Sequence, residues 1–247
     1  MDETANDIYK KVIQASLKEN RDDFCPLRKE KQMDYLFAAL ADDFQDKNLK
    51  ILEAGCGYGR LLYFLNQYDQ NQFYFGIDYV PELITAGKKI FANNQNVHLE
   101  RQDFMKLPDK YNKFFDIAIS YKTLSWLPYY ETVVRQLINV TRNKIFITSL
   151  FCDEDVDYLV KIYTDAQNNT GESFSFLNTY SLAKFKKYCY GLGAKDIKTT
   201  NMTIDVDLPK PVNQEKLTTY TITTTDQHRL EVTNNIILNW KLIEIIL

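Results

Sequence analysis

Between residues 49 and 151, short apolar runs alternate with segments of helical periodicity. Five of the runs have the length of a buried strand and are bounded by polar or glycine-containing turns. They are residues 49–52, 72–78, 96–101, 114–121 and 144–151. Between them, apolar residues recur at helical spacing over residues 60–68 and onward from Pro81 and Pro128. This alternation predicts an α/β fold with a doubly wound, mostly parallel sheet.

The segments on either side extend this prediction. Residues 7–19 and 28–44 carry apolar stripes and predict two N-terminal helices. The elements predicted after the fifth strand are a helix over 180–191, a strand within 194–206, a hairpin formed by 218–225 and 229–233, and a last strand over 240–247. We therefore expect a single domain over residues 1–247. It would contain a seven-stranded sheet whose last strand is antiparallel, N-terminal helices, and a C-terminal β-hairpin insertion at 207–235.

Residues 152–179 form a longer connection without a clear pattern. Connections of this length usually carry structure of their own or cover a binding site. Residues 157–166 have a spacing compatible with a helix, and residues 171–178 have the character of a loop over a substrate. The nearby acids are typical of a helix start, and no metal site is predicted. They are Asp153, Glu154, Asp155 and Asp157.

Composition restricts the class of protein. The chain has 247 residues, of which 45% are hydrophobic, and a formal net charge of −3. These values are ordinary for a globular protein, and the missing basic field argues against a nucleic-acid substrate. Four scattered cysteines without a C-x-x-C pair indicate reduced thiols and a cytoplasmic location. The sequence shows neither a signal peptide nor an apolar run long enough to cross a membrane.

A glycine-rich motif, Glu53-Ala-Gly55-Cys-Gly57-Tyr-Gly59, lies between the first predicted strand and the next helix. Glycine is favoured where the backbone takes positive φ or approaches a ligand closely. The spacing is G-x-G-x-G, whereas dinucleotide-binding folds use G-x-G-x-x-G. The carboxylate of Glu53 would favour a positively charged ligand over a phosphate.

The motif resembles the first motif of class I S-adenosylmethionine-dependent methyltransferases. In that family the loop wraps the methionine end of the cofactor, which carries a positive amine and sulfonium. The resemblance implies S-adenosyl-L-methionine as cofactor, S-adenosyl-L-homocysteine as product, and residues 1–46 as lid helices. It also assigns cofactor binding to the loop residues Glu53, Ala54, Gly55, Cys56, Gly57 and Gly59.

Acidic residues follow the second and third predicted strands. Asp78 ends the second strand, where an acid can accept hydrogen bonds from ribose hydroxyls. Tyr79, beside it, is included in the cofactor site. The resemblance implies that Asp103 binds the adenine amine and that the backbone N–H of Phe104 meets a ring nitrogen.

The end of the fourth predicted strand supplies the remaining candidates. In a doubly wound sheet this end adjoins the glycine loop, and ligands bind there. We therefore expect Ser120, Tyr121 and Lys122 to face the cofactor or the acceptor. Residues 123–128 resemble the family's loop that packs an apolar or aromatic side chain on the adenosine, here Trp126.

Methyl transfer is an in-line displacement in which alignment can contribute about 7–11 kcal/mol. A general base is needed only when the acceptor must lose a proton. The candidates are Tyr121, Tyr58 and His228, together with an acid in the 152–179 insert. An acceptor that is already anionic would need no base, and a cation such as Lys122 or Arg28 would then bind it.

Residues 208–247 resemble methyltransferases associated with bacterial capsule and cell-surface saccharide biosynthesis. The favoured interpretation is O-methyl transfer to a small polar acceptor, such as a sugar, a phosphorylated precursor or a capsule intermediate. The hairpin would extend the sheet or form a homodimer contact. Alternatives are N-methylation of nucleic acid or protein, aminopropyl transfer, and a cofactor-binding partner subunit without catalysis. N-methylation of bases is disfavoured because residues 120–123 do not form an Asn/Asp-Pro-Pro-aromatic run.

Overall fold

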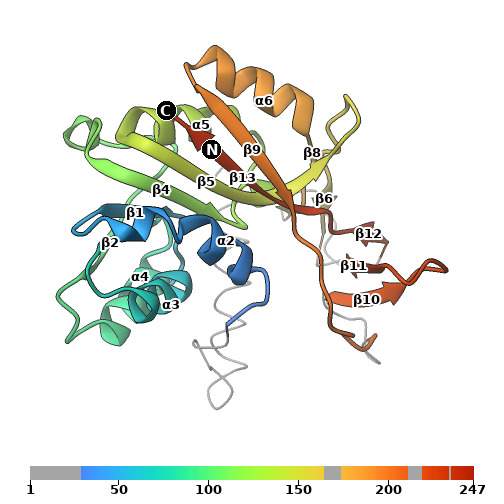
Figure 1. The fold of residues 1–247 in the computed structure, drawn as a ribbon, viewed down its shortest axis with the longest axis horizontal. Helices are drawn as coiled ribbons and strands as arrows, with labels where there is room; N and C mark the ends of the chain where they lie inside the picture. Colours follow the sequence, from blue (N-terminus) through green and yellow to red (C-terminus); the bar gives the residue numbers. More distant parts are fainter. Residues whose placement is uncertain (1–28, 164–173, 211–218, 234) are drawn as a thin grey trace.

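A central sheet organises the fold. The computed structural model describes residues 29–163, 174–210, 219–233 and 235–247. The strand order is β3-β2-β1-β4-β5-β13-β9, with the short β8 beside β5 (Figure 1). The strands are β1 (Lys50–Ala54), β2 (Phe73–Asp78), β3 (Val97–Arg101), β4 (Phe115–Tyr121), β5 (Thr141–Cys152), β8 (Tyr180–Ser181), β9 (Asp196–Asn201) and β13 (Trp240–Ile246).

Strand directions confirm the predicted α/β sheet. Strands β1 to β5 pair in parallel with one another, and β13 runs antiparallel to both β5 and β9. The seven-stranded path is therefore as predicted, and β8 adds a short parallel pairing to β5. Strands β1, β4 and β5 are buried on both faces, which explains their nearly continuous apolar sequences.

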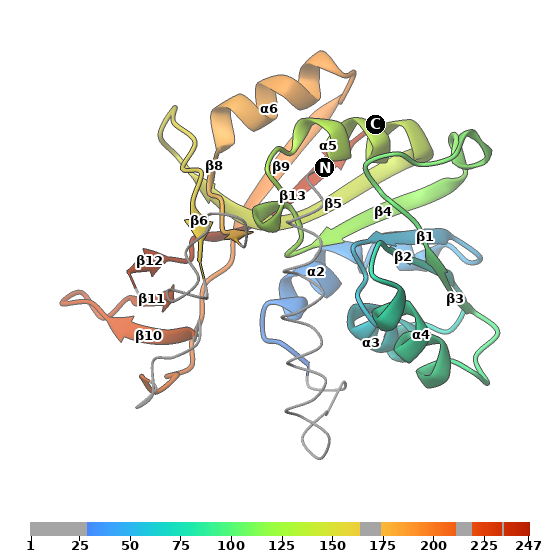
Figure 2. The ribbon, with the colours of Figure 1, turned by 180° about the vertical axis from the view of Figure 1, so that it is seen from behind.

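Helices cover both faces of the sheet (Figures 1 and 2). On one face lie α2 (Met33–Leu40), α3 (Arg60–Tyr68) and α4 (Pro81–Ile90), and on the other α5 (Glu131–Val140) and α6 (Leu182–Gly191). Each face has its own apolar core, one including Leu36, Leu62 and Ile84, the other Val134 and Phe185. None of the described helices combines the length and apolarity needed to cross a membrane.

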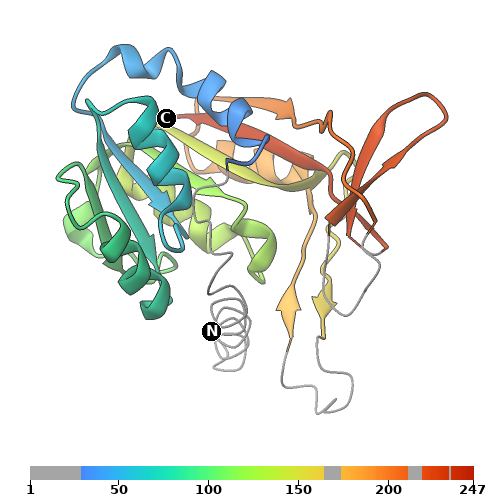
Figure 3. The same cartoon turned by 90° about the horizontal axis from the view of Figure 1, so that it is seen from below.

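A second, smaller sheet lies beyond the carboxyl ends of the long strands (Figure 3). It contains β10 (Thr219–Thr223), β11 (Arg229–Thr233) and β12 (Ile236–Ile237), paired antiparallel. The predicted hairpin is present, and β12 makes it a three-stranded sheet. The amide of Gln32, just before α2, donates to Glu231 on β11 at 2.8 Å. The small sheet is therefore tied to the segment that enters the domain.

Two predicted helices differ in extent. The helix expected over 28–44 is limited to α2, followed by a 3-10 turn, η1 (Asp43–Gln45). The helix expected from Pro128 begins instead at Glu131, after another 3-10 turn, η3 (Leu124–Trp126). The carbonyl of Leu127 accepts hydrogen bonds from Asn178 and Tyr180, which hold this residue in an extended conformation. A third 3-10 turn, η2 (Asp109–Tyr111), precedes β4.

The insert at 152–179 contains strands where a helix was expected. Residues 157–163 pair with the returning chain through β6 (Lys161–Ile162), β7 (Ser175–Phe176) and a bridge between Tyr158 and Thr179. The prediction of a helix over 157–166 is therefore wrong for the described residues. The amide of Asn178 substitutes for a backbone group here, because its oxygen accepts from the N–H of Val160 at 2.9 Å.

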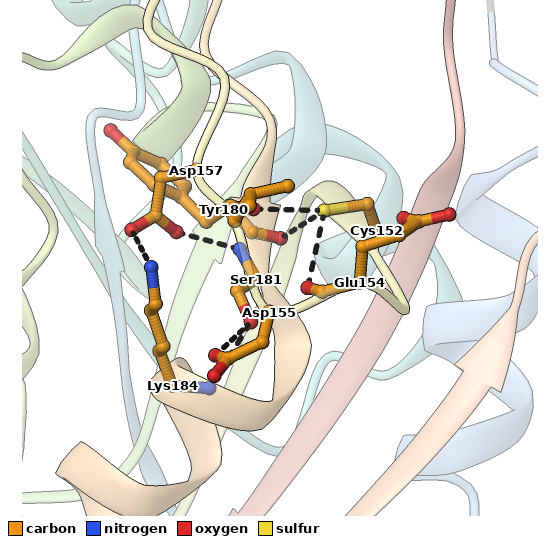
Figure 4. Close-up of polar contacts among 8 residues, drawn as sticks. Cys152, Glu154, Asp155, Asp157, Tyr180, Ser181 and Lys184 are labelled. Carbon is orange, nitrogen blue, oxygen red and sulfur yellow. Dashed lines mark hydrogen bonds and ion pairs between the residues drawn. The ribbon is translucent and has the colours of Figure 1, made fainter.

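Two acids of the insert, Asp155 and Asp157, lie at the N-terminus of α6 instead of starting a helix of their own (Figure 4). Asp157 accepts from the backbone N–H of Ser181 at 2.7 Å and pairs with Lys184 at 3.2 Å. The hydroxyl of Ser181 caps the helix by accepting from the N–H of Lys184. Negative groups at a helix N-terminus are favourable, and this accounts for the position of Asp155 and Asp157. The predicted helix over 7–19, Arg28, and residues 171–173 of the predicted 171–178 loop lie outside the described residues.

Replacing Asn178 by alanine should destabilise the protein by about 1–3 kcal/mol, because the half-buried N–H of Val160 loses its acceptor and the carbonyl of Leu127 loses a donor. Chemical denaturation measures this change in the free energy of unfolding. Asn139→Ala, at an exposed position of α5, is the matched control and should change stability little. Equal effects of the two substitutions would show that Asn178 does not hold the insert.

Candidate functional site

The predicted cofactor residues gather at one edge of the sheet. The glycine loop follows β1, Asp78 ends β2, Asp103 follows β3, and Tyr121 ends β4. These four strands are neighbours and parallel, so their carboxyl ends share one edge. Strand β1 lies between β2, to which the chain continues on one side, and β4, which pairs with β1 on the other side. Ligands of doubly wound sheets bind in the crevice at such a switch point.

The glycine loop is built from left-handed backbone. Gly55, Gly57 and Gly59 have φ of 79°, 58° and 87°. A Cβ at Gly55 would lie 2.6 Å from the Thr123 side chain, and one at Gly59 would lie 2.7 Å from Phe91. At Gly57 it would meet only Leu83, at an ordinary 3.8 Å. Gly55 and Gly59 are thus required by packing and conformation, whereas Gly57 has room for a Cβ and is constrained by its backbone conformation.

Asp78 holds the glycine loop in place. One carboxylate oxygen accepts from the N–H of Gly57 and the other from the N–H of Val80, both at 2.9 Å. Burial raises the pKa of Asp78, and these backbone hydrogen bonds offset part of that rise. The residue that was expected to bind ribose therefore also fixes the loop that precedes it.

Glu53 is a buried carboxylate with an unsatisfied oxygen. Its side chain is 3% exposed, and Oε2 has no hydrogen-bond partner among the described residues. Burial and the charge of Asp78 raise the pKa of Glu53 well above its usual value, and Arg60 offsets this only in part. An orphaned acid beside an open glycine turn fits a ligand that brings positive charge. The residues present therefore fit the amine-bearing end of the predicted cofactor.

The other predicted cofactor residues occupy different positions around this edge. Asp103 accepts from the N–H of Met105 at 2.9 Å, which forms a turn, and Phe104 is buried in the α5-side core. Tyr79 is half-buried beneath the guanidinium of Arg101, 5.5 Å from its ring centre. Trp126 is 37% exposed in η3.

Three predicted residues are fully enclosed by protein. Ala54 lies in the α5-side core, and Cys56 is buried in the glycine loop. Burial, together with the charges of Glu53 and Asp78, raises the pKa of the Cys56 thiol, so that it stays neutral. Ser120 is buried and its hydroxyl has no partner among the described residues.

The three catalytic candidates are not brought together. Tyr121 donates its hydroxyl to Glu30 at 3.0 Å, and burial and this carboxylate raise its pKa, which makes it a poor base. Tyr58 lies half-buried inside the glycine loop. His228 is 78% exposed next to Asp226, in the turn between β10 and β11.

Sequence reasoning missed two acids at this edge. Glu30, just before α2, pairs with Lys122 at 2.8 Å and with Arg60. Glu231 reaches the same region from β11 through its bond to Gln32. Burial raises the pKa of Glu231, while Lys122 and Gln32 lower it. Neither acid belongs to a motif or a strand end of the main sheet, so no sequence signal placed them here.

Fold and site together define a doubly wound α/β domain whose candidate binding residues gather at the switch point. The family model described as a methyltransferase domain matches residues 45–216, which is most of the chain. The chain therefore belongs to the methyltransferase domain family. The predicted cofactor, S-adenosyl-L-methionine, is confirmed as that of the family. No curated protein is significantly similar to the chain in sequence.

Solved structures share the fold at low sequence identity. Magnesium protoporphyrin IX methyltransferase from Synechocystis PCC 6803, with bound S-adenosylhomocysteine, has 14% identity and a TM-score of 0.58, over 96% of this chain and 94% of that one. The complex between the Haloferax volcanii Trm112 methyltransferase activator and a putative methyltransferase has 14% identity, a TM-score of 0.59 and the same coverage of both chains. The [4+2]-cyclase SpnF has 15% identity and a TM-score of 0.53. The match covers 69% of this chain and 60% of the cyclase.

Glu53→Gln should stabilise the ligand-free protein at pH 8 by about 1–3 kcal/mol, because burying Glu53 at that pH costs either an unsatisfied charge or the uptake of a proton. The folded-state pKa of Glu53 is raised, so the native protein loses stability as pH rises above the usual glutamate value. The advantage of the variant should therefore grow with pH from about 4.5 upward.

Thermal unfolding of both proteins between pH 4.5 and 8 measures this difference. Glu82→Gln, an exposed first-turn acid on α4, is the control and should follow the native curve. Parallel pH profiles for Glu53→Gln and the native protein would contradict a charged, buried Glu53.

Proposed function

We propose that this protein transfers the methyl group of S-adenosyl-L-methionine to the oxygen of a small polar acceptor. The observation that carries the proposal is the unsatisfied carboxylate of Glu53 at the open turn of the glycine loop. When bound, the cofactor supplies an activated methyl group on a sulfonium. The protein's own task is to hold and align the reactants and exclude water.

The cofactor-binding roles predicted from the sequence are retained in this proposal. Glu53 faces the positive methionine end, and the loop backbone from Gly55 to Gly59 lets that end approach closely. Asp78 accepts from the ribose through its remaining lone pairs, since each of its oxygens already receives one backbone N–H. Asp103 and Phe104 flank the adenine, and Trp126 covers the adenosine.

Charged and polar groups beside Tyr121 favour a polar acceptor. Lys122, Glu30, Gln32 and Glu231 meet where β4 ends and the small sheet begins. An apolar acceptor would exclude water from these charged groups, which costs free energy. Glu231 joins Tyr58 and His228 as a candidate base, because a half-buried carboxylate with a raised pKa can take a proton from a hydroxyl.

The proposed acceptors are a sugar, a phosphorylated precursor or a capsule-biosynthesis intermediate, on the strength of the C-terminal resemblance. A cytoplasmic location agrees with three free, buried cysteines, Cys56, Cys152 and Cys189. The exposed Ile222 and Ile237 of the small sheet support a homodimer contact there.

A cofactor-binding partner subunit is the second candidate. Two neighbours favour keeping it: one is a putative methyltransferase bound to an activator protein, and another of the same fold is a cyclase. The fold alone therefore does not establish methyl transfer. Methylation of a nitrogen acceptor is the remaining alternative.

Calorimetry with S-adenosylhomocysteine tests the cofactor site. We expect micromolar binding, none of NAD, and a loss of about 1.5–3 kcal/mol in Asp78→Ala, the size of a charge-assisted hydrogen bond. Glu82→Ala removes a nearby exposed carboxylate and should bind as the native protein does. Unchanged affinity in Asp78→Ala would exclude its role at the ribose, and absent binding to the native protein would exclude the proposed function.

A further inference from the structure

Three hydrogen-bond donors converge on a single carboxylate at the acceptor side of the site. Glu30 receives the ammonium of Lys122 at 2.8 Å, the hydroxyl of Tyr121 at 3.0 Å, and the guanidinium of Arg60. Arg60 begins α3 directly after the glycine loop, and Tyr121 and Lys122 end β4. The donors therefore belong to the rigid sheet edge, whereas the acceptor comes from the segment that precedes α2. We call Arg60, Tyr121 and Lys122 the donor cluster.

The donor cluster has the chemistry of an anion site. Guanidinium groups match the geometry of carboxylates and phosphates, and lysine adds a point charge. Burial alone would raise the pKa of Glu30, but Lys122 and Arg60, with the hydrogen bonds of Lys122 and Tyr121, keep it below its usual value. The cluster thus stabilises a negative charge strongly enough to overcome the cost of burying it.

The backbone at Lys122 fixes the cluster. Lys122 is a non-glycine residue with φ of 56°, and its N–H donates to Thr148 at 2.9 Å. Its ammonium lies 4.8 Å above the ring of Trp240. Left-handed backbone at a lysine is strained, and such strain persists where the surroundings enforce it, often at ligand sites. Here it directs the ammonium across the end of the sheet toward Arg60 and Glu30.

The side-chain partners of Glu30 are the members of this cluster, and its carbonyl accepts from the N–H of Met33. Its neighbours Lys29 and Lys31 form exposed ion pairs with Asp34 and Asp205, and exposed pairs contribute little to stability. An incoming anion would replace the Glu30 carboxylate charge for charge, so the donors would stay paired. Glu231, the other acid facing Lys122, is bound to Gln32 and does not occupy the cluster.

We propose that the donor cluster is a binding site for a carboxylate or phosphate group of a ligand, and that Glu30 is the protein's own carboxylate occupying it. The inference rests on the proposed function, because it places this site beside the cofactor. Two sources carry the required group: an anionic acceptor, and the α-carboxylate of the cofactor. An anionic acceptor would also meet the requirement for a nucleophile that needs no general base.

Binding measurements on the full chain distinguish these sources. The proteins are the native chain, Glu30→Gln, the double variant Glu30→Gln/Lys122→Gln, and the exposed-acid control Glu82→Gln. The probes are inorganic phosphate, added to protein saturated with S-adenosylhomocysteine, and S-adenosylhomocysteine compared with 5′-methylthioadenosine, which lacks the amino-acid group. Thermal unfolding verifies that each variant is folded.

If the acceptor supplies the anion, Glu30→Gln should bind phosphate about tenfold more tightly than the native chain, as one freed charge-assisted contact predicts. The double variant should lose this gain. If the cofactor supplies the anion, Glu30→Gln should bind S-adenosylhomocysteine more tightly than the native chain does, and both proteins should bind methylthioadenosine with the same affinity. Phosphate should then compete with S-adenosylhomocysteine. Either result supports the site.

Unchanged affinities for phosphate and S-adenosylhomocysteine in Glu30→Gln would overturn the proposal. Equal weakening of both nucleosides would also overturn it, because Glu30 would then only hold the N-terminal segment in place. Failure of the native chain to bind S-adenosylhomocysteine would instead count against the proposed function. Phosphate added to the free protein would still test the cluster in that case.

Discussion

Two buried carboxylates at the ends of adjacent parallel strands constrain the whole site. Glu53 precedes the glycine loop on β1, and Asp78 ends β2. Asp78 accepts hydrogen bonds from backbone N–H groups, which offset part of the cost of burying its charge. The same hydrogen bonds fix the left-handed turn. Glu53 keeps an unsatisfied oxygen and a raised pKa. The fold tolerates this cost because both strands lie deep in a large apolar sheet, whose burial stabilises the domain.

The parts that sequence predicted well are those with local causes. Helix α3 spans the predicted residues 60–68, because a left-handed glycine starts it and its apolar residues have helical spacing. Asp78 and Tyr121 lie at strand ends because apolar runs stop there. Helix α5, by contrast, begins three residues later than Pro128 suggested, because distant side chains of the insert hold Leu127 extended. Local patterns carry no information on such contacts.

The same limit applies to the acceptor side. Glu30 and Glu231 are separated by about 200 positions in the sequence, yet Gln32 links their two segments. Neither acid belongs to a sequence motif. Each lies in a segment outside the main sheet, before α2 or on β11. The helix expected at 157–166 failed for a related reason, since Asn178 supplies a hydrogen-bond acceptor that only the folded insert provides. Sequence therefore located the edge where the candidate cofactor residues gather, whereas tertiary contacts define the surroundings of that edge.

Arg60 connects the two sides of the site. It pairs with Glu30 and also lowers the pKa of Glu53, so one guanidinium serves two buried or half-buried acids. A positive ligand group beside Glu53 would balance the negative charge of that acid in place of Arg60. Arg60 would then interact more strongly with an anion at the donor cluster. A ligand anion that replaced Glu30 there would keep this arrangement, because one negative charge takes the place of another. Through Arg60, the charge at Glu53 and the anion at the donor cluster influence each other, because coupling between two sites is reciprocal.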